Sequence, residues 1–124
     1  MKFQKDETLF TGRLKSMVFA LKGAFKLVTT EHSIMVQSII AILITIAGFY
    51  FGITRIEWMI QILVFGLVLS IEGLNTAVEK VADFIHPEYH KRIGFIKDIA
   101  AGAVFFAALT AIVIGCIIYF PYLF

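Results

Sequence analysis

Long uncharged stretches, separated by short charged segments, dominate the pattern of this chain. No charged side chain occurs between Ser33 and Thr54, and a helix of that length extends about 33 Å at about 1.5 Å per residue. The hydrocarbon core of a bilayer is about 30 Å thick. We therefore predict a first membrane span at about residues 34–53.

The same pattern predicts two further spans. The chain carries no charge after Asp98, which indicates a span at about residues 99–119. The stretch from Trp58 to Ile71 is also uncharged but is too short to cross a bilayer alone. It reaches the required length when it continues through the polar residues that follow, so we predict a span at about residues 56–82.

A different pattern occupies about residues 8–30. Large apolar side chains recur there at helical spacing and share one face about 100° wide. Arg13 lies on one flank of this face and three lysines lie on the other. This arrangement is typical of a helix in the membrane interface, although a helix packed against other protein has the same pattern. The apolar residues are Phe10, Leu14, Met17, Val18, Leu21, Phe25 and Val28, and the lysines are Lys15, Lys22 and Lys26.

The composition agrees with a membrane protein. Hydrophobic residues make up 60% of the chain and charged residues 16%, whereas soluble proteins average roughly 45–50% and about 25%. A domain of this size cannot bury so much apolar surface. The net charge of +2 is too small to indicate a nucleic-acid partner. We predict one all-α domain over residues 1–124, with a surface helix and three transmembrane helices.

Lysine and arginine positions predict the orientation. Most of these residues lie in residues 1–32 and between Lys80 and Lys97, whereas the connection between the first two spans carries only Arg55. Because basic loops remain on the cytoplasmic side, we predict a cytoplasmic N-terminus and a cytoplasmic connection between the last two spans.

Acidic and polar side chains occupy one face of the predicted span at 56–82. At about 100° per residue, Glu72, Asn75, Glu79 and Asp83 lie within about 80° of one another. A charged side chain at the centre of a span costs roughly 2.5–3.5 kcal/mol on insertion scales. We therefore expect this face to turn toward protein, water or a bound cation. A hydrogen-bonded seam of protonated carboxyls between helices is the structural alternative.

Carboxylates in this position suit metal binding or proton transfer. Mg²⁺ prefers a few carboxylates together with water and substrate phosphates. Glu72 lies deepest in the span and suits a general base. Glu31 adds an acid at the start of the first span, and antiparallel spans would allow it to lie at the depth of Glu79.

Two features beyond the second span have competing interpretations. His86 and His90 suggest a metal pair, but Pro87 between them favours solvated loop histidines. Lys97 and Asp98 open the third predicted span. They suit an interfacial anchor with an acid at the helix start, or a phosphate-facing lysine beside the carboxylates.

Three segments together resemble one known family. They are EGLNTAVEKVAD at residues 72–83, PEYH at 87–90 and KDIAAGAV at 97–104. The combination of E-x-x-N-[ST]-A-[IV]-E-x-x-x-D, E-Y-H and K-D-x-x-x-[AG]-A-V is similar to the prokaryotic diacylglycerol kinase family, which includes the undecaprenol kinases. The resemblance covers roughly residues 10–120.

This resemblance implies a fold and a reaction. Members are small enzymes of the bacterial cytoplasmic membrane, with a surface helix and three spans, and they assemble as homotrimers with active sites between subunits. They transfer the γ-phosphoryl group of Mg-ATP to the hydroxyl of a lipid alcohol at the cytoplasmic surface of the bilayer. The implied co-substrate is ATP, the implied cofactor is Mg²⁺, and the acceptor is diacylglycerol or undecaprenol.

The resemblance also implies roles for individual residues. Glu72 corresponds to the catalytic base and Asn75 to a residue that positions the reacting groups. Glu31 and Glu79 correspond to the ligands of the divalent metal. The implied ATP-binding residues are Arg13, Phe19, Glu31, Glu79, Asp83, Glu88, Tyr89, His90, Lys97 and Asp98.

Two positions depart from the diacylglycerol-specific members. Phe19 stands where those members carry tyrosine, so a hydroxyl contact is lost, and Gln37 replaces a second acid near the start of the first span. Residues 98–104 are closer to the undecaprenol-phosphorylating subgroup. These departures leave the lipid acceptor open and do not affect the reaction class.

Two other classes of protein compete with the lipid kinase. A small ion-coupled transporter would use Glu72 as an intramembrane proton site, but it would not require the polar residues at 89–90 and 97–98. A non-catalytic membrane scaffold would leave Glu72 and Glu79 unexplained.

Overall fold

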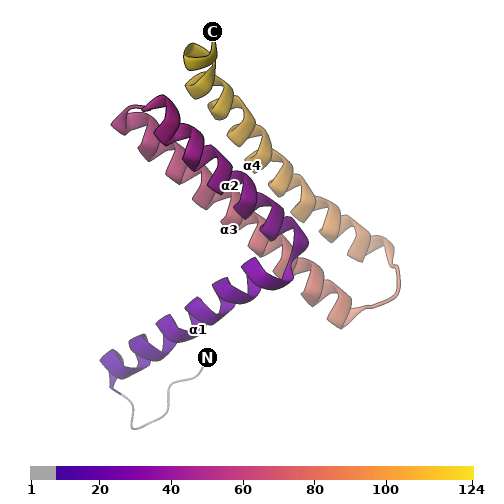
Figure 1. Cartoon of the computed structure of the whole chain (residues 1–124). Coiled ribbons are helices and arrows are strands. Elements are labelled where there is room, and N and C mark those ends of the chain that lie inside the picture. The colour runs from indigo at the N-terminus through magenta and orange to yellow at the C-terminus, as the bar shows by residue number, and fades with distance from the viewer. Residues whose placement is uncertain (1–7) are drawn as a thin grey trace.

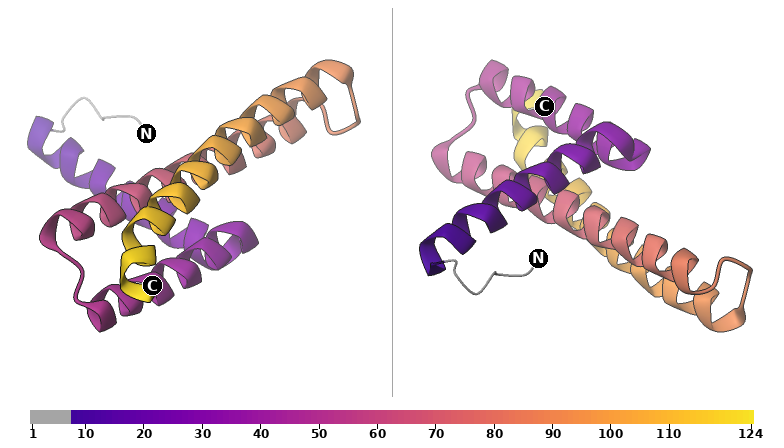
Figure 2. Two further views of the ribbon diagram at one scale, coloured as in Figure 1. Left: turned by 90° about the horizontal axis from the view of Figure 1, so that it is seen from above. Right: turned by 90° about the horizontal axis from the view of Figure 1, so that it is seen from below.

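Four helices make up residues 8–124, the part of the chain that the computed structural model describes (Figure 1). They are α1 (Leu9–Thr30), α2 (His32–Phe51), α3 (Arg55–Ile85) and α4 (Lys91–Leu123). The N-terminal lysines Lys2 and Lys5 lie outside the described residues. Helices α3 and α4 form an antiparallel pair, α2 packs against α3, and α1 extends away from this bundle (Figures 1 and 2). The predicted all-α class is confirmed.

Helices α2, α3 and α4 are each long and apolar enough to cross a membrane, as predicted. Their ends differ from the ends of the predicted spans. The predicted first span reaches residue 53, but α2 ends at Phe51 because Gly52 adopts a left-handed conformation with φ 63° and caps the helix. The predicted third span covers residues 99–119, but α4 runs from Lys91 to Leu123 and includes Pro121. Hydrophobicity sets the length of a span, whereas backbone hydrogen bonds and caps set the length of a helix.

A capping box begins α3 shortly after Gly52, the residue that caps α2. Thr54 Oγ1 accepts a hydrogen bond from the backbone N–H of Glu57 at 3.2 Å, and Glu57 Oε1 accepts from the Thr54 N–H at 2.9 Å. Each residue satisfies a backbone donor that the helix leaves unpaired. Tyr122 donates to the same Glu57 Oε1 at 2.6 Å and so ties the end of α4 to the start of α3.

Two small apolar clusters form the core. One joins Ile53 to Ile118 and Tyr119, and the other joins α3 to Ala107 of α4. Many large apolar side chains on the bundle remain exposed. Such exposure is expected for helices whose outer faces meet lipid rather than water.

Helix α1 meets the bundle near its C-terminal end. Leu27 lies close to Gly73 of α3, since a Cβ atom on Gly73 would be 3.1 Å from Leu27 Cδ1. Closer to the N-terminal end of α1 than Leu27, the side chains of Leu21 and Phe25 are each 70% exposed. Much of the apolar surface of α1 is therefore available to a surface other than its own bundle.

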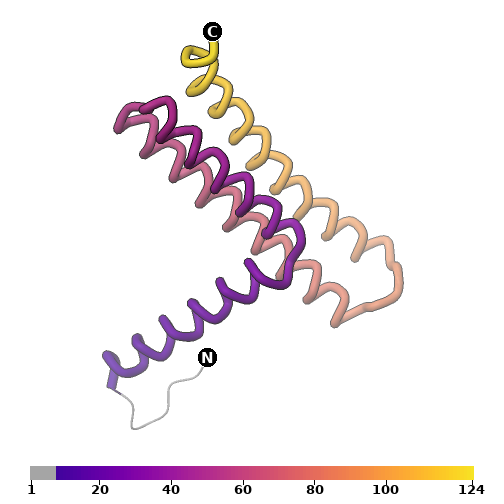
Figure 3. The backbone as a smooth tube through the Cα atoms, in the orientation of Figure 1, coloured from indigo at the N-terminus to yellow at the C-terminus, as the bar shows by residue number. Residues whose placement is uncertain are grey.

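Figure 3 traces the sharp change of direction between α1 and α2. Glu31 makes this bend with φ −97° and ψ 117°, an extended conformation between two helices. The backbone N–H of Glu31 still bonds the carbonyl of Leu27 at 3.3 Å, and its own carbonyl accepts from Met35 at 3.0 Å. One residue thus ends α1 and starts α2.

Gly48 allows α2 to approach Trp58 of α3 closely. A Cβ atom at residue 48 would lie 2.7 Å from Trp58 Cη2, whereas nothing lies within 4 Å of a Cβ at Gly66. We expect Gly48→Ala to destabilise the fold by about 1–3 kcal/mol through overpacking. Gly66→Ala is the control, and it should be neutral or stabilising by up to about 1 kcal/mol.

Thermal unfolding of the purified protein in detergent, followed by circular dichroism, measures this difference. Equal unfolding midpoints for the two variants would contradict the close packing of Trp58 on Gly48.

Candidate active site

The acidic stripe of α3 continues the buried face of that helix. Val64 and Val68 pack with Ala107 of α4, and the same face continues to Glu72 and Thr76, each 7% exposed. The expectation that this face turns toward protein is confirmed for Glu72. Farther along α3, Glu79 and Asp83 are exposed, so the stripe passes from buried to open toward the α3–α4 connection.

Asn75 and Glu79 form a hydrogen-bonded pair one helical turn apart. Asn75 Nδ2 donates to Glu79 Oε1 at 3.2 Å. The Asn75 Oδ1 atom is buried and has no hydrogen-bond partner within residues 8–124. The amide therefore orients the Glu79 carboxylate and keeps one acceptor available beside it.

Glu31 reaches the same part of α3 from the bend between α1 and α2. Its Oε1 lies 3.3 Å from Lys80 Nζ, and the Glu31 side chain is 26% exposed. This ion pair brings Glu31 alongside the turn that carries Glu79 and Lys80, which agrees with the depth expected from antiparallel spans. Lys80 was not predicted as a site residue. No sequence signal identifies it, because its contact depends on the bend at Glu31.

Lys97 and Asp83 connect α4 to α3. Their Nζ and Oδ1 atoms are 2.6 Å apart, and the side chains are 37% and 59% exposed. The idea that Lys97 and Asp98 open a helix is wrong, because α4 begins at Lys91, where the His90 ring accepts the Arg92 N–H at 3.1 Å. Lys97 instead lies within the helix, beside a carboxylate of the predicted site.

The α3–α4 connection holds the two histidines by backbone contacts. His86 Nδ1 donates to the Glu88 carbonyl oxygen at 2.6 Å, and the two imidazole rings are 5.3 Å apart. Residues 8–124 contain no group of three His, Cys, Asp or Glu side chains placed to hold a metal. These contacts favour the loop interpretation of the histidines. Tyr89 is 86% exposed at the same connection.

Arg13 and Phe19 lie on α1, apart from the other predicted ATP-binding residues. Both are exposed, and Lys22 Nζ lies 5.8 Å from the centre of the Phe19 ring. The first half of α1 points away from the α3–α4 connection within one chain (Figures 1 and 2). The structure therefore brings Glu31, at the bend between α1 and α2, to α3 and brings Lys97 of α4 to Asp83, but it leaves the predicted residues on α1 separate.

Three apolar helices with a buried glutamate and further acids toward one end define a membrane protein with a carboxylate site. A sequence profile of the family described as prokaryotic diacylglycerol kinase matches residues 18–119. The chain is 38% identical to the undecaprenol kinase of Bacillus subtilis (strain 168), over 86% of this chain and 87% of that relative.

Two diacylglycerol kinases are also similar. The Haemophilus influenzae (strain ATCC 51907 / DSM 11121 / KW20 / Rd) protein is 32% identical over 91% of this chain and 97% of its own length. The Escherichia coli (strain K12) protein is 28% identical over 91% and 93%. The chain belongs to the prokaryotic diacylglycerol kinase family. It is a lipid kinase, for which ATP is the co-substrate, and the transporter interpretation has no support.

The Asp83–Lys97 pair should contribute little to stability. Both side chains are more than a third exposed, and exposed ion pairs typically contribute about 0.2–1 kcal/mol. A double-mutant cycle with Asp83→Asn, Lys97→Met and the combined variant should give a coupling energy in this range. Unfolding free energies in detergent provide the measurement. A coupling above about 3 kcal/mol would show instead that the pair is effectively buried.

Proposed function

We propose that this chain is an undecaprenol kinase that works as a homotrimer at the cytoplasmic surface of the membrane, with Mg²⁺ as cofactor. The identity of 38% to a relative named undecaprenol kinase exceeds the 28% to 32% shared with the two named diacylglycerol kinases. Residues 98–104 resemble the undecaprenol-phosphorylating subgroup and so favour the same acceptor. The observation that carries the site assignment is the burial of Glu72 on the face that continues to Asn75 and Glu79.

Glu72 would act as the general base. Phosphoryl transfer depends mainly on positioning and on neutralising charge, so the protein has to orient the lipid hydroxyl and accept its proton. The hydroxyl oxygen forms a bond to the γ-phosphorus of ATP while the bond from that phosphorus to the bridging oxygen breaks. ADP leaves, and the hydroxyl proton passes to the Glu72 carboxylate. A base buried in a membrane helix can meet a hydroxyl that arrives from the bilayer.

Asn75 would position the reacting groups. Its Nδ2 atom is engaged by Glu79, and its buried Oδ1 atom has no partner within the described residues. An acceptor in this place can receive a hydrogen bond from the lipid hydroxyl. The amide then links the base and the metal ligand on one helix face.

Glu31 and Glu79 would hold the magnesium ion. They would supply carboxylate oxygens, because Mg²⁺ is usually bound through one or two carboxylates together with water and substrate phosphates. Bound Mg²⁺ would neutralise negative charge on the phosphate oxygens. Lys80 orients the Glu31 carboxylate through the ion pair at 3.3 Å.

ATP would bind around the α3–α4 connection. Glu88, Tyr89 and His90 lie in this connection, and Lys97 beside Asp83 supplies a cation for phosphate oxygens. Asp98 adds a hydrogen-bond acceptor on the following residue.

Arg13 and Phe19 would complete the nucleotide site from a neighbouring subunit. Within one chain, the first half of α1 points away from the α3–α4 connection (Figure 2). A homotrimer with its sites between subunits brings α1 of one copy to the connection of another. The exposed apolar side chains on the bundle supply surface for such contacts.

Helix α1 would lie in the membrane interface on the cytoplasmic side. Its exposed apolar residues, such as Leu21 and Phe25, can enter the acyl boundary while the flanking lysines reach headgroups. Basic residues flank the α3–α4 connection, and they belong on the same side of the membrane. They are Lys80, Lys91, Arg92 and Lys97. This orientation places the proposed site where ATP arrives from water and the lipid from the bilayer.

The choice of acceptor can be tested directly. Purified protein in vesicles is given labelled ATP with Mg²⁺ and either undecaprenol or diacylglycerol. We expect kcat/KM to be at least about tenfold higher for undecaprenol, equivalent to about 1.4 kcal/mol of transition-state discrimination. A preference for diacylglycerol would overturn the acceptor but keep the reaction. Transfer to neither lipid would overturn the proposed function.

Glu72→Gln should reduce turnover by about 10²- to 10⁴-fold, because it removes a base without removing a metal ligand. ATP affinity, measured by equilibrium binding, should be nearly unchanged. Glu57→Gln is the control, because it makes the same change at the opposite end of α3 and the glutamine oxygen can still accept from Thr54 and Tyr122, so turnover should stay near normal. Near-normal turnover in Glu72→Gln would exclude Glu72 as the base.

A further inference from the structure

One ion pair joins the bend between α1 and α2 to the exposed side of α3. Glu31 Oε1 lies 3.3 Å from Lys80 Nζ, and the Glu31 side chain is 26% exposed whereas that of Lys80 is 70% exposed. The backbone of Glu31 is held by hydrogen bonds to Leu27 and Met35 at the ends of the two helices. A lysine head stands on a flexible four-carbon stem. The ammonium group is therefore the movable partner of this pair.

Both carboxylates of the proposed metal site already have one oxygen engaged by a nitrogen of α3. Glu31 Oε1 contacts the Lys80 ammonium group, and Glu79 Oε1 accepts a hydrogen bond from Asn75 Nδ2 at 3.2 Å. The amide is neutral, whereas the ammonium group carries a full positive charge. Of the two contacts, only the one with Lys80 sets a cation beside a proposed metal ligand.

A positive charge beside a carboxylate opposes metal binding in two ways. It neutralises the group that attracts the metal ion, and it repels the ion itself. A divalent ion and an ammonium group repel each other twice as strongly as two single charges at the same distance, because the Coulomb energy scales with the product of the charges. Glu31 is the more buried member of the pair, and partly buried charges are screened less by salt than exposed ones.

The phosphates of ATP would reverse this balance. They add several negative charges to the site, and Mg²⁺ is usually bound through one or two carboxylates together with substrate phosphates. Lysine binds phosphate as a point charge, and the exposed Lys80 stem allows its head to turn from Glu31 to a phosphate oxygen. The same charge that opposes binding of a metal ion alone then favours binding of a metal–nucleotide complex.

We propose that Lys80 makes metal binding at Glu31 conditional on nucleotide. Without nucleotide, the Lys80 ammonium group is the counter-ion of Glu31 and weakens the binding of divalent cations. With nucleotide, the ammonium group moves to a phosphate oxygen and leaves the Glu31 carboxylate free to bind the metal. This inference rests on the proposed function, which makes Glu31 a metal ligand.

Mn²⁺ binding to the full-length protein in detergent, without nucleotide, tests this role. Electron paramagnetic resonance measures the free Mn²⁺. Lys80→Met should bind Mn²⁺ at least about fivefold more tightly than the wild type, because it removes the charge and keeps an unbranched side chain. Lys80→Arg keeps the charge and should resemble the wild type. Glu31→Gln combined with Lys80→Met should lose the gain.

Arg55→Met is the control for a general effect of charge. Arg55 is exposed at the other end of α3, about 37 Å from Lys80 at about 1.5 Å per residue. This variant also removes one positive charge and should bind Mn²⁺ like the wild type. The complex of Mn²⁺ with a non-hydrolysable ATP analogue should bind to Lys80→Met no more tightly than to the wild type, because the variant also lacks the phosphate contact.

Unchanged or weaker Mn²⁺ binding in Lys80→Met would overturn the proposal, and weaker binding would show that Lys80 only orients Glu31. A gain that survives Glu31→Gln would overturn it as well, because the metal would then bind elsewhere. An equal gain for the metal–nucleotide complex would show that Lys80 repels cations regardless of nucleotide, which contradicts the conditional role.

The Mg²⁺ dependence of lipid phosphorylation separates a failure of this inference from a failure of the proposed function. If Glu31→Gln leaves that dependence unchanged, Glu31 is not a metal ligand and the proposed site is wrong. If Glu31→Gln raises the Mg²⁺ requirement while Lys80→Met leaves the affinity for Mn²⁺ unchanged, only the role of Lys80 is wrong.

Discussion

The packing of α3 against α4 is the contact on which the rest of the structure depends. Hydrogen bonding between Tyr122 and Glu57 closes one end of this contact, and Asp83 with Lys97 closes the other. The apolar middle joins Val64 and Val68 to Ala107. Because Glu72 continues the same face of α3, the packing that stabilises the helix pair also removes a carboxylate from lipid.

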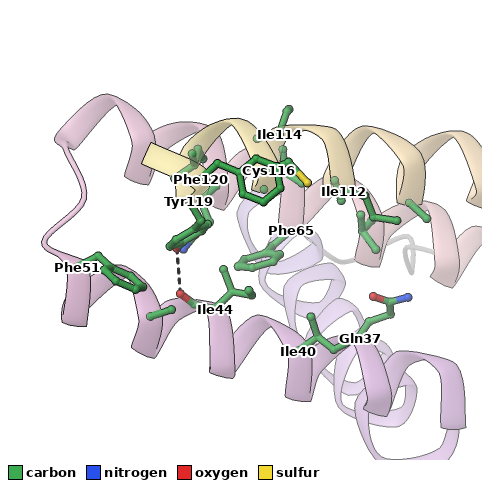
Figure 4. Close-up of a pocket in the computed structure, with 18 of the residues that line it drawn as sticks. Gln37, Ile40, Ile44, Phe51, Phe65, Ile112, Ile114, Cys116, Tyr119 and Phe120 are labelled. Carbon is green, nitrogen blue, oxygen red and sulfur yellow. Dashed lines mark hydrogen bonds between the residues drawn. The ribbon is translucent and has the colours of Figure 1, made fainter. Parts of the chain in front are cut away.

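The two ends of the bundle are suited to different tasks. Acids and amides near the α3–α4 connection remain partly open, which suits exchange of nucleotide and metal with water. Toward the α2–α3 connection, Gln61 contacts Tyr119, and both side chains are buried beside an apolar groove between α2 and α4 (Figure 4). A small membrane enzyme can in this way separate phosphoryl transfer from the contacts that hold its helices in the bilayer.

The fold was largely predictable because few solutions exist for a chain in lipid. Backbone polar groups must be paired internally there, which makes an uncharged stretch of spanning length a helix. The helix ends were less predictable, since they depend on local caps. Gly52 stops α2 through its left-handed backbone, and the ring of His90 starts α4 well before the uncharged stretch begins. Neither cap is visible in a pattern of hydrophobic residues.

The sequence by itself determined the class of the protein, its three apolar helices and the alignment of Glu72, Asn75, Glu79 and Asp83 on one face, because helical periodicity fixes which residues of one helix lie together. Only the tertiary structure decided which residues meet between helices. The pairing of Glu31 with Lys80 depends on the bend between α1 and α2, and the contact of Tyr119 with both Ile44 and Gln61 depends on how α2 and α4 approach α3. Contacts between helices follow from packing angles and backbone bends that no single helix encodes.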